Sequence, residues 1–181
     1  MRNPEEKICG NNRERKQKEK KWKRFRQETE KIADPLGMKI DKGIEDTVTA
    51  LRVYKFPTSA SCEGHINEKE GHPYPWVEIC ALPPEGWEED EEIKEEWRIK
   101  NLEEQKRITD LLTEFYKDRN TSFDKMLSFR FIGSFGGFRI QSTSAEQSPL
   151  FSEGERKKRL EEHRKEMNDF AEFLKKKYIG E

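Results

Sequence analysis

Residues 59–65 (SASCEGH) carry hydroxyls, a thiol, a carboxylate and an imidazole in adjacent positions. Gly64 can adopt a positive φ that other residues resist, so the chain can turn sharply there. Such a turn can aim consecutive backbone N–H groups into one concavity, which suits a carboxylate or a phosphate. The small side chains before Cys62 let a ligand approach the backbone closely. This segment predicts a ligand-binding or catalytic site, and a tight polar turn around a small buried cysteine remains the alternative.

The same part of the chain contains residue types that bind zinc. Cys62, His65, His72 and Cys80 would supply two thiolates and two imidazoles, a set that zinc accepts. A strong zinc signal repeats a short pair of ligands twice. Here His72 falls in a loop with prolines and Cys80 falls within a predicted strand, so the spacing is poor and we expect no metal.

Cys62 and His65 are also candidates for a nucleophile and its base. Cysteine catalysis usually needs an orienting third group and an oxyanion site as well. Glu63 or Glu78 could be that third group, although no spacing singles out either carboxylate. The sequence leaves open whether the thiol and the imidazole meet across the glycine turn or diverge.

Arg130 and Arg139 flank a glycine-rich turn, residues 133–137, between two alternating segments. If both side chains share one face of the paired strands, they form a two-guanidinium patch that suits a phosphate or a carboxylate. A solvent-facing sheet surface is the alternative. His163 lies on the apolar stripe of the last predicted helix, where a packed histidine is far more common than a ligand.

The composition indicates one domain with its apolar residues concentrated in part of the chain. Of 181 residues, 40% are charged and 31% are hydrophobic. No apolar run is long enough to span a membrane, and the net charge of −1 gives no global electrostatic argument for nucleic acid. Three cysteines are too few for a disulfide scaffold, and the first residues lack an apolar signal segment. We therefore expect a cytoplasmic protein with free thiols.

Hydrophobic periodicity predicts an α+β fold, in which a small mixed sheet of about four short strands is packed by long charged helices. The expected helices cover about residues 13–33, 42–56, 85–119 and 153–178, and the expected strands cover 58–62, 76–82 and two segments of 127–142. The predicted core consists of Ile44, Val48, Leu51, Val77, Ile79, Leu111, Phe115, Phe129, Phe131, Phe138, Ile140, Phe170 and Leu174.

The distribution of charge divides the chain into two segments. Residues 1–36 are expected to be a basic N-terminal helix or arm, and residues 37–181 a single α+β domain with a long C-terminal helix. Residues 13–26 hold nine Lys/Arg and two Glu, whereas residues 85–104 hold ten Asp/Glu and three Lys/Arg. The basic helix suits RNA phosphates. A solvated helix face and pairing with the acidic segment are the alternatives.

Several patches resemble the wybutosine-synthesis tRNA methyltransferase family. They are residues 41–51 (DKGIEDTVTAL), 58–65 (TSASCEGH), 76–79 (WVEI) and 137–142 (GFRIQS), which together cover less than a third of the chain. In that family a helix leads into a Thr-Ser-Ser-Cys-Ser-Gly-Arg loop and then a strand with a tryptophan. The loop here departs from that pattern by having a glutamate and a histidine. It also resembles a set of small bacterial and phage proteins of unknown function.

The resemblance implies S-adenosylmethionine as the cofactor and tRNA or another RNA as the partner. In methyl transfer a protein mainly orients two substrates, so no catalytic side chain is required. On this hypothesis residues 61–65 form the pocket floor, and hydroxyls and backbone N–H groups hold the cofactor's carboxylate. Glu78 would accept an amine or a hydroxyl, and Arg139 would face an RNA phosphate. The full expected ligand-binding set is Ser59, Ser61, Cys62, Glu63, Gly64, His65, Trp76, Glu78 and Arg139.

A non-enzymatic binding or regulatory module is the alternative function. In that case the charged helices mediate protein contacts and the loop is structural. Ligand binding at residues 59–65 is the property that separates the two hypotheses.

Overall fold

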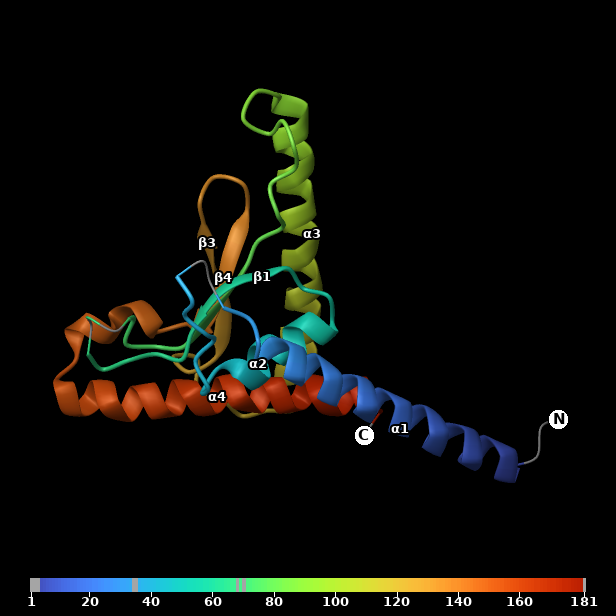
Figure 1. The fold of residues 1–181 in the computed structure, drawn as a ribbon. Helices are drawn as coiled ribbons and strands as arrows, with labels where there is room; N and C mark the ends of the chain where they lie inside the picture. The colour runs from blue at the N-terminus through green and yellow to red at the C-terminus, as the bar shows by residue number, and fades with distance from the viewer. Residues whose placement is uncertain (1–3, 34–35, 68, 70, 181) are drawn as a thin grey trace.

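The computed structural model describes residues 4–33, 36–67, 69 and 71–180. The predicted segments 1–36 and 37–181 are therefore described only in part. The residues outside the described chain are 1–3, 34–35, 68, 70 and 181. The helices and the sheet confirm the α+β class (Figure 1). Among the described residues, no helix combines the length and the apolar character that crossing a membrane requires. The elements are α1 (Pro4–Thr29), α2 (Glu45–Val53), β1 (Thr58–Cys62), β2 (Trp76–Ile79), α3 (Glu91–Tyr116), β3 (Leu127–Ile132), β4 (Gly137–Ser142), the 3₁₀ helix η1 (Ala145–Leu150) and α4 (Glu153–Ile179).

The sheet has the strand order β1-β2-β4-β3. All three pairings are antiparallel, in place of the expected mixed sheet. Val77 of β2 lies opposite Ile140 of β4, and Ile79 lies opposite Phe138. Because side chains alternate between the two faces of a strand, these four point to the same face. The alternation of apolar and polar residues in β2 and β4 therefore creates one buried face.

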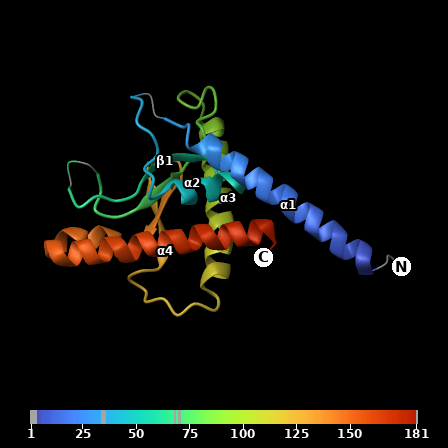
Figure 2. The ribbon, with the colours of Figure 1, turned by 60° about the horizontal axis from the view of Figure 1, so that its bottom comes forward.

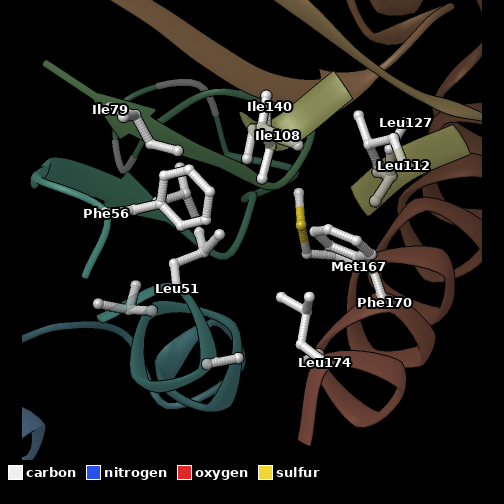
Figure 3. Close-up of a cluster of buried hydrophobic side chains, with 14 of the residues drawn as sticks. Leu51, Phe56, Ile79, Ile108, Leu112, Leu127, Ile140, Met167, Phe170 and Leu174 are labelled. Atoms are coloured by element: carbon white, nitrogen blue, oxygen red, sulfur yellow. The ribbon is translucent and has the colours of Figure 1, made fainter. Parts of the chain in front are cut away.

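Helices α2, α3 and α4 contribute the side chains that pack with this face (Figure 3). Leu51 of α2, Ile108 of α3 and Phe170 of α4 come together beneath the strands and are fully buried. Removing this apolar surface from water is the main term that favours folding. Ten of the predicted core residues are buried: Ile44, Val48, Leu51, Val77, Ile79, Phe115, Phe138, Ile140, Phe170 and Leu174.

The other three core predictions were less accurate. Leu111 and Phe129 are only partly buried and pack at the margin of the core. Phe131 was wrongly placed in the core, since 59% of its surface is exposed. It lies opposite Phe138 in the register of β3 and β4, so it has the expected face. However, β3 is an edge strand, and no further strand covers the outer side of Phe131.

Several element boundaries also differ from the expected ones. Helix α3 begins at Glu91 instead of residue 85, because the Asp90 side chain accepts bonds from the backbone N–H groups of the first turn and caps the helix. Helix α1 begins at Pro4, well before residue 13, and β2 ends at Ile79 instead of residue 82. The 3₁₀ helix η1 was not expected.

The opposite face of the sheet carries a second, smaller apolar cluster. Its members are Cys62, Tyr74, Trp76 and Ala145. Trp76 directly precedes Val77 in β2, so the two side chains point to opposite faces. The loop before β2 supplies Tyr74 and η1 supplies Ala145. Both faces of the sheet are therefore partly covered. Cys62, the last residue of β1, connects this second cluster to the turn at residues 63–65.

Buried amides fasten α3 to the turn between β3 and β4. Asn101 accepts the N–H of Ala81 at 2.8 Å and donates to the carbonyl of Phe135 at 2.8 Å. Gln105 donates to the carbonyl of Gly136, also at 2.8 Å. The bonds to Phe135 and Gly136 satisfy carbonyl groups of the turn, and the bond from Ala81 joins α3 to the segment after β2. They thereby hold the hairpin alongside the helix.

The two oppositely charged segments extend in different directions. The N-terminal half of α1 projects away from the rest of the protein, and the first turns of α3 lie on another side (Figures 1 and 2). Trp22, near the other end of α1, is buried and its ring lies 6.3 Å from that of Tyr178. Thr29 at the end of α1 is also fully buried. The fold therefore separates the basic and acidic segments instead of pairing them.

Replacing Phe138 by alanine should lower the free energy of unfolding by about 3–5 kcal/mol, because a fully buried aromatic side chain leaves a cavity. Phe131→Ala is the matched control, since Phe131 lies opposite Phe138 but is 59% exposed. Its replacement should cost less than about 1 kcal/mol. Urea unfolding at neutral pH measures both values, and equal losses would contradict the difference in burial.

His163 of α4 is a buried histidine, as its place on the apolar stripe predicts. Its Nε2 lies 3.4 Å from the hydroxyl oxygen of Ser144. Its Nδ1 is buried without a hydrogen-bond partner in the part of the chain that the structure describes. Burial, reinforced by the positive charge of Arg159, lowers the pKa of His163 from 6.5 to about 4. The folded protein therefore holds a neutral imidazole at pH 7.

Acid should destabilise the protein through His163. The unfolded state binds a proton near pH 6.5 and the folded state only near pH 4, so this contribution to stability is complete above pH 6.5 and falls as the pH drops. The loss should reach roughly 2–3 kcal/mol at pH 4. Urea unfolding of the wild type and of His163→Gln between pH 7 and pH 4 measures it. The same slope in both proteins would show that other groups cause the acid sensitivity.

Candidate functional site

The turn that follows β1 uses its backbone donors within the chain. Gly64 has a φ of +84° and lets the chain reverse after Cys62. The N–H of Glu63 donates to Asp41 Oδ2 at 3.1 Å. That of Gly64 donates to Cys62 Sγ at 3.3 Å, and that of His65 donates to a carbonyl of the following loop at 2.7 Å. The donors expected to hold a ligand's carboxylate thus already have acceptors, one of them the carboxylate of Asp41.

The last helix holds this turn from the other side. Arg164 of α4 donates from Nε to the carbonyl of Glu63 at 3.0 Å and from Nη2 to the carbonyl of Gly64 at 2.7 Å. The Glu63 carboxylate accepts the N–H of Gly43 at 2.6 Å and lies 3.6 Å from Arg164 Nη2. Glu63 therefore joins the turn both to the segment before α2 and to α4. Its side chain has a structural task that the sequence did not indicate.

Asp41, Cys62 and His65 bring a carboxylate, a thiol and an imidazole together beside the turn. One donor atom of each residue lies within 4.8 Å of the other two. His65 Nε2 is 3.4 Å from Asp41 Oδ2. Cys62 is buried, whereas Asp41 and His65 are half-buried and reach solvent. Gly71 packs against the cluster, because a Cβ at this position would lie 3.1 Å from Cys62 Sγ.

The Cys62 thiol is protonated at neutral pH in this environment. Burial raises its pKa by disfavouring the thiolate, and the carboxylates of Asp41 and Glu63 act in the same direction. The backbone N–H groups of Gly64 and His72 oppose this shift without cancelling it. A cysteine nucleophile needs the thiolate. This environment therefore does not favour a cysteine–histidine nucleophile.

The four zinc ligands considered from the sequence are not brought together. Cys80 follows β2 and lies at the far end of that strand from Cys62. The ring of His72 stacks on that of Tyr74, with centroids 5.3 Å apart. Among the described residues, the cluster that places three such groups together contains Asp41 instead.

Four of the expected ligand residues meet at the outer face of the sheet, which Ser59 reaches from the edge strand β1. Ser59 donates to Glu78 Oε1 at 2.9 Å, and Arg139 Nε donates to Glu78 Oε2 at 3.2 Å. The Arg139 guanidinium also lies 3.9 Å above the ring of Trp76. Arg130 is the cross-strand neighbour of Arg139 and forms an ion pair with a glutamate of η1. The two-guanidinium patch therefore exists, but each guanidinium already has a carboxylate partner.

A groove of about 600 Å³ runs along β1, which is an edge strand. One wall comes from β1, another from α2, and a third from the segment between α1 and α2. Arg52 of α2 is held at the groove because its Nη1 donates to Thr29 Oγ1 at 3.0 Å. The lining mixes apolar, hydroxyl and charged side chains: Ile32, Ala33, Met38, Lys39, Ile40, Asp41, Val48, Arg52, Thr58, Ser59, Ala60 and Ser61.

The structure distributes the nine expected ligand residues over three neighbouring places. Ser61 lines the groove, Ser59 lines it as well and also bonds to Glu78, residues 62–65 form the turn, and Trp76, Glu78 and Arg139 lie on the outer face of the sheet. Ser61 and Cys62 are consecutive in a strand and so point to opposite faces. The fold therefore does not place all nine residues in a single concavity.

Sequence reasoning missed three functional candidates: Asp41, Arg52 and Arg164. Asp41 belongs to the patch that resembles the methyltransferase family, yet nothing in its spacing pointed to the turn. Arg52 and Arg164 occupy helix positions that look like ordinary solvated charges. Their roles depend on contacts with distant segments, for which the sequence has no local signal.

No family model matches the chain, and no curated protein or solved structure matches it. The resemblance to the wybutosine-synthesis family therefore stays a prediction made from the residues.

Gly64→Ala should destabilise the fold as a whole. A Cβ at Gly64 would lie 2.6 Å from Leu160 Cδ1 and 2.7 Å from the carbonyl carbon of Tyr74, and the positive φ adds strain. Unfolding free energy should fall by more than about 2 kcal/mol. Gly133→Ala is the matched control, since φ is +62° there and no atom lies within 4 Å of its Cβ, so the cost should be only about 1 kcal/mol. Similar losses in urea unfolding would contradict close packing at the turn.

Proposed function

We propose that the chain binds a small molecule in the groove along β1, and that this molecule is a charged nucleoside of the S-adenosylmethionine class. The groove is the observation that supports this proposal. Its volume of about 600 Å³ is in the range of small-molecule sites, and its lining combines apolar, hydroxyl and charged side chains. Ser59 and Ser61, two of the residues expected from the sequence to bind the cofactor, lie in its wall. The class of ligand follows from the resemblance together with this lining.

The lining contains a partner for each kind of group on such a molecule. Arg52 and Lys39 suit a carboxylate, which guanidinium and ammonium groups bind through charge-assisted hydrogen bonds. The hydroxyls of Ser59 and Ser61 suit an amine or a ribose hydroxyl. The apolar side chains of Ile32, Ala33, Met38 and Ile40 suit the flat face of a base.

Arg52 is the residue on which this proposal depends most. Its bond to Thr29 Oγ1 at 3.0 Å holds the guanidinium at the groove before any ligand arrives. A guanidinium that is already oriented loses less conformational entropy on binding than a freely rotating one. Thr29 itself is fully buried, so this anchor belongs to the core and not to a mobile surface.

Methyl transfer to RNA is the reaction that the resemblance implies. It needs two oriented substrates and no catalytic side chain, which agrees with a site that lacks an activated nucleophile. The exposed part of α1 would meet RNA phosphates through its Lys and Arg side chains. A binding or regulatory module would use the same groove without transferring a group.

Isothermal titration of S-adenosylmethionine, S-adenosylhomocysteine and adenosine into the wild-type protein tests the groove. We expect one binding event per chain for the first two compounds. Arg52→Met should weaken their binding by more than about tenfold, because a hydrogen-bonded charge is lost. Arg98→Met on α3 is the control, since the Arg98 side chain is 43% exposed and pairs with Glu95 outside the groove.

No heat with any of the three compounds would contradict the proposed ligand class. Equal affinities of the wild type and Arg52→Met would place the ligand elsewhere. Binding without methyl transfer to a tRNA pool, measured with methyl-labelled cofactor, would favour the binding module over the enzyme.

A further inference from the structure

We propose that Asp41, Cys62 and His65 form a binding site for a divalent transition-metal ion, with zinc as the occupant that the donor set favours. The three residues offer a carboxylate oxygen, a sulfur and an imidazole nitrogen, which are the three donor types that zinc binds in proteins. Each donor atom lies within 4.8 Å of the other two. This site is distinct from the groove along β1, although Asp41 lines both.

The distances fit metal coordination after a small adjustment. With bonds of about 2.0–2.3 Å in a tetrahedral site, neighbouring ligand atoms are roughly 3.3–3.8 Å apart. His65 Nε2 and Asp41 Oδ2 already lie 3.4 Å apart. The side chains of Asp41 and His65 are half-buried, so small rotations can bring them closer to the Cys62 sulfur without disturbing the core.

The surroundings of Cys62 suit a metal-bound thiolate. The N–H of Gly64 donates to Sγ at 3.3 Å, and the N–H of His72 is a second backbone donor to the same sulfur. Such donors stabilise negative charge on sulfur, as they do on other anions. On coordination the thiol releases its proton to solvent, and the cation takes the place of that proton.

Further bonds position Asp41, as is usual for ligands at metal sites. Asp41 Oδ2 accepts the N–H of Glu63 at 3.1 Å, and the carbonyl of Glu63 is in turn bound by Arg164 Nε at 3.0 Å. Gly71 lies beside the sulfur, where a Cβ would come within 3.1 Å of Sγ. The absence of a side chain at Gly71 leaves space next to the donor atoms.

Three protein ligands leave a fourth coordination position for water or a substrate. Asp41 and His65 reach solvent, so this position faces outward, whereas Cys62 closes the buried side. Zinc sites with an open position usually serve catalysis, and closed four-ligand sites serve structure. The larger apolar cluster, on the other face of the sheet, is built without these residues, so the fold should form without the metal.

Titration with Co²⁺, followed by absorbance, tests the site because a thiolate ligand produces a charge-transfer band in the near ultraviolet. The experiment uses a Cys9→Ser, Cys80→Ser protein, in which Cys62 is the sole remaining thiol. We expect the band to saturate at one equivalent of Co²⁺ and to disappear on addition of Zn²⁺. Adding Cys62→Ser should abolish it. Asp41→Asn and His65→Ala should each weaken Co²⁺ binding at least tenfold, whereas Asp46→Asn, at a carboxylate of α2 that pairs with Arg26 outside the cluster, should leave it unchanged.

Absence of the band in the folded single-thiol protein would overturn the proposal. So would unchanged Co²⁺ affinity in both Asp41→Asn and His65→Ala. Far-ultraviolet circular dichroism establishes that each variant is folded. If Cys62→Ser does not fold, the Co²⁺ affinities of Asp41→Asn and His65→Ala test the proposal. The nucleoside titrations are made with a chelator present, so failure of the metal site and failure of the groove are separate results.

Discussion

The carboxylate of Asp41 is the group on which the organisation of the site depends. It accepts the N–H of Glu63 at 3.1 Å, lies 3.4 Å from the imidazole of His65 and lines the groove along β1. A backbone N–H at the end of a strand has no ladder partner, and leaving it unpaired away from water costs free energy. The charge-assisted bond to Asp41 removes that cost and places a negative charge beside the imidazole. One side chain thus shapes the turn and sets the electrostatics of both candidate sites.

Strand β1 keeps the two candidate sites apart although they are adjacent in sequence. Ser61 lines the groove, while the next residue, Cys62, joins the apolar cluster around Trp76 on the other face. Asp41 reaches both because it comes from the segment before α2, which lies along the open edge of β1. An ion bound by Asp41 and a ligand in the groove would therefore change each other's affinity, and linkage requires the two effects to be equal.

The high content of charged residues reflects helices that are longer than the core they cover. Part of α1 projects beyond the core, and its exposed ion pairs, such as Arg24 with Glu28, each contribute less than about 1 kcal/mol. Stability comes instead from the compact set of apolar residues on one face of the sheet. The charged surfaces are thus available for solvent or for partners without affecting the fold, and the fold itself keeps the basic and acidic segments apart.

The sequence by itself determined where the helices and strands lie, apart from their exact ends and the 3₁₀ helix η1, because their signals are local. Spacings of three and four in α2, alternation in β2 and β4, and a glycine after Cys62 all identify elements that the structure contains. It also located the turn at residues 62–65, although not the contacts that hold it. Phe131 shows the limit of local signals, because its face was predicted and its exposure depended on β3 being an edge strand.

Only the tertiary structure decided which groups meet at the site. Asp41 bonds to a residue 22 positions along the chain, and Arg164 bonds to Gly64 across 100 positions. These contacts depend on how α4 and the segment before α2 pack against the sheet. Packing is a property of the whole core, in which every buried side chain limits the positions of its neighbours, and so no local pattern of residues encodes it.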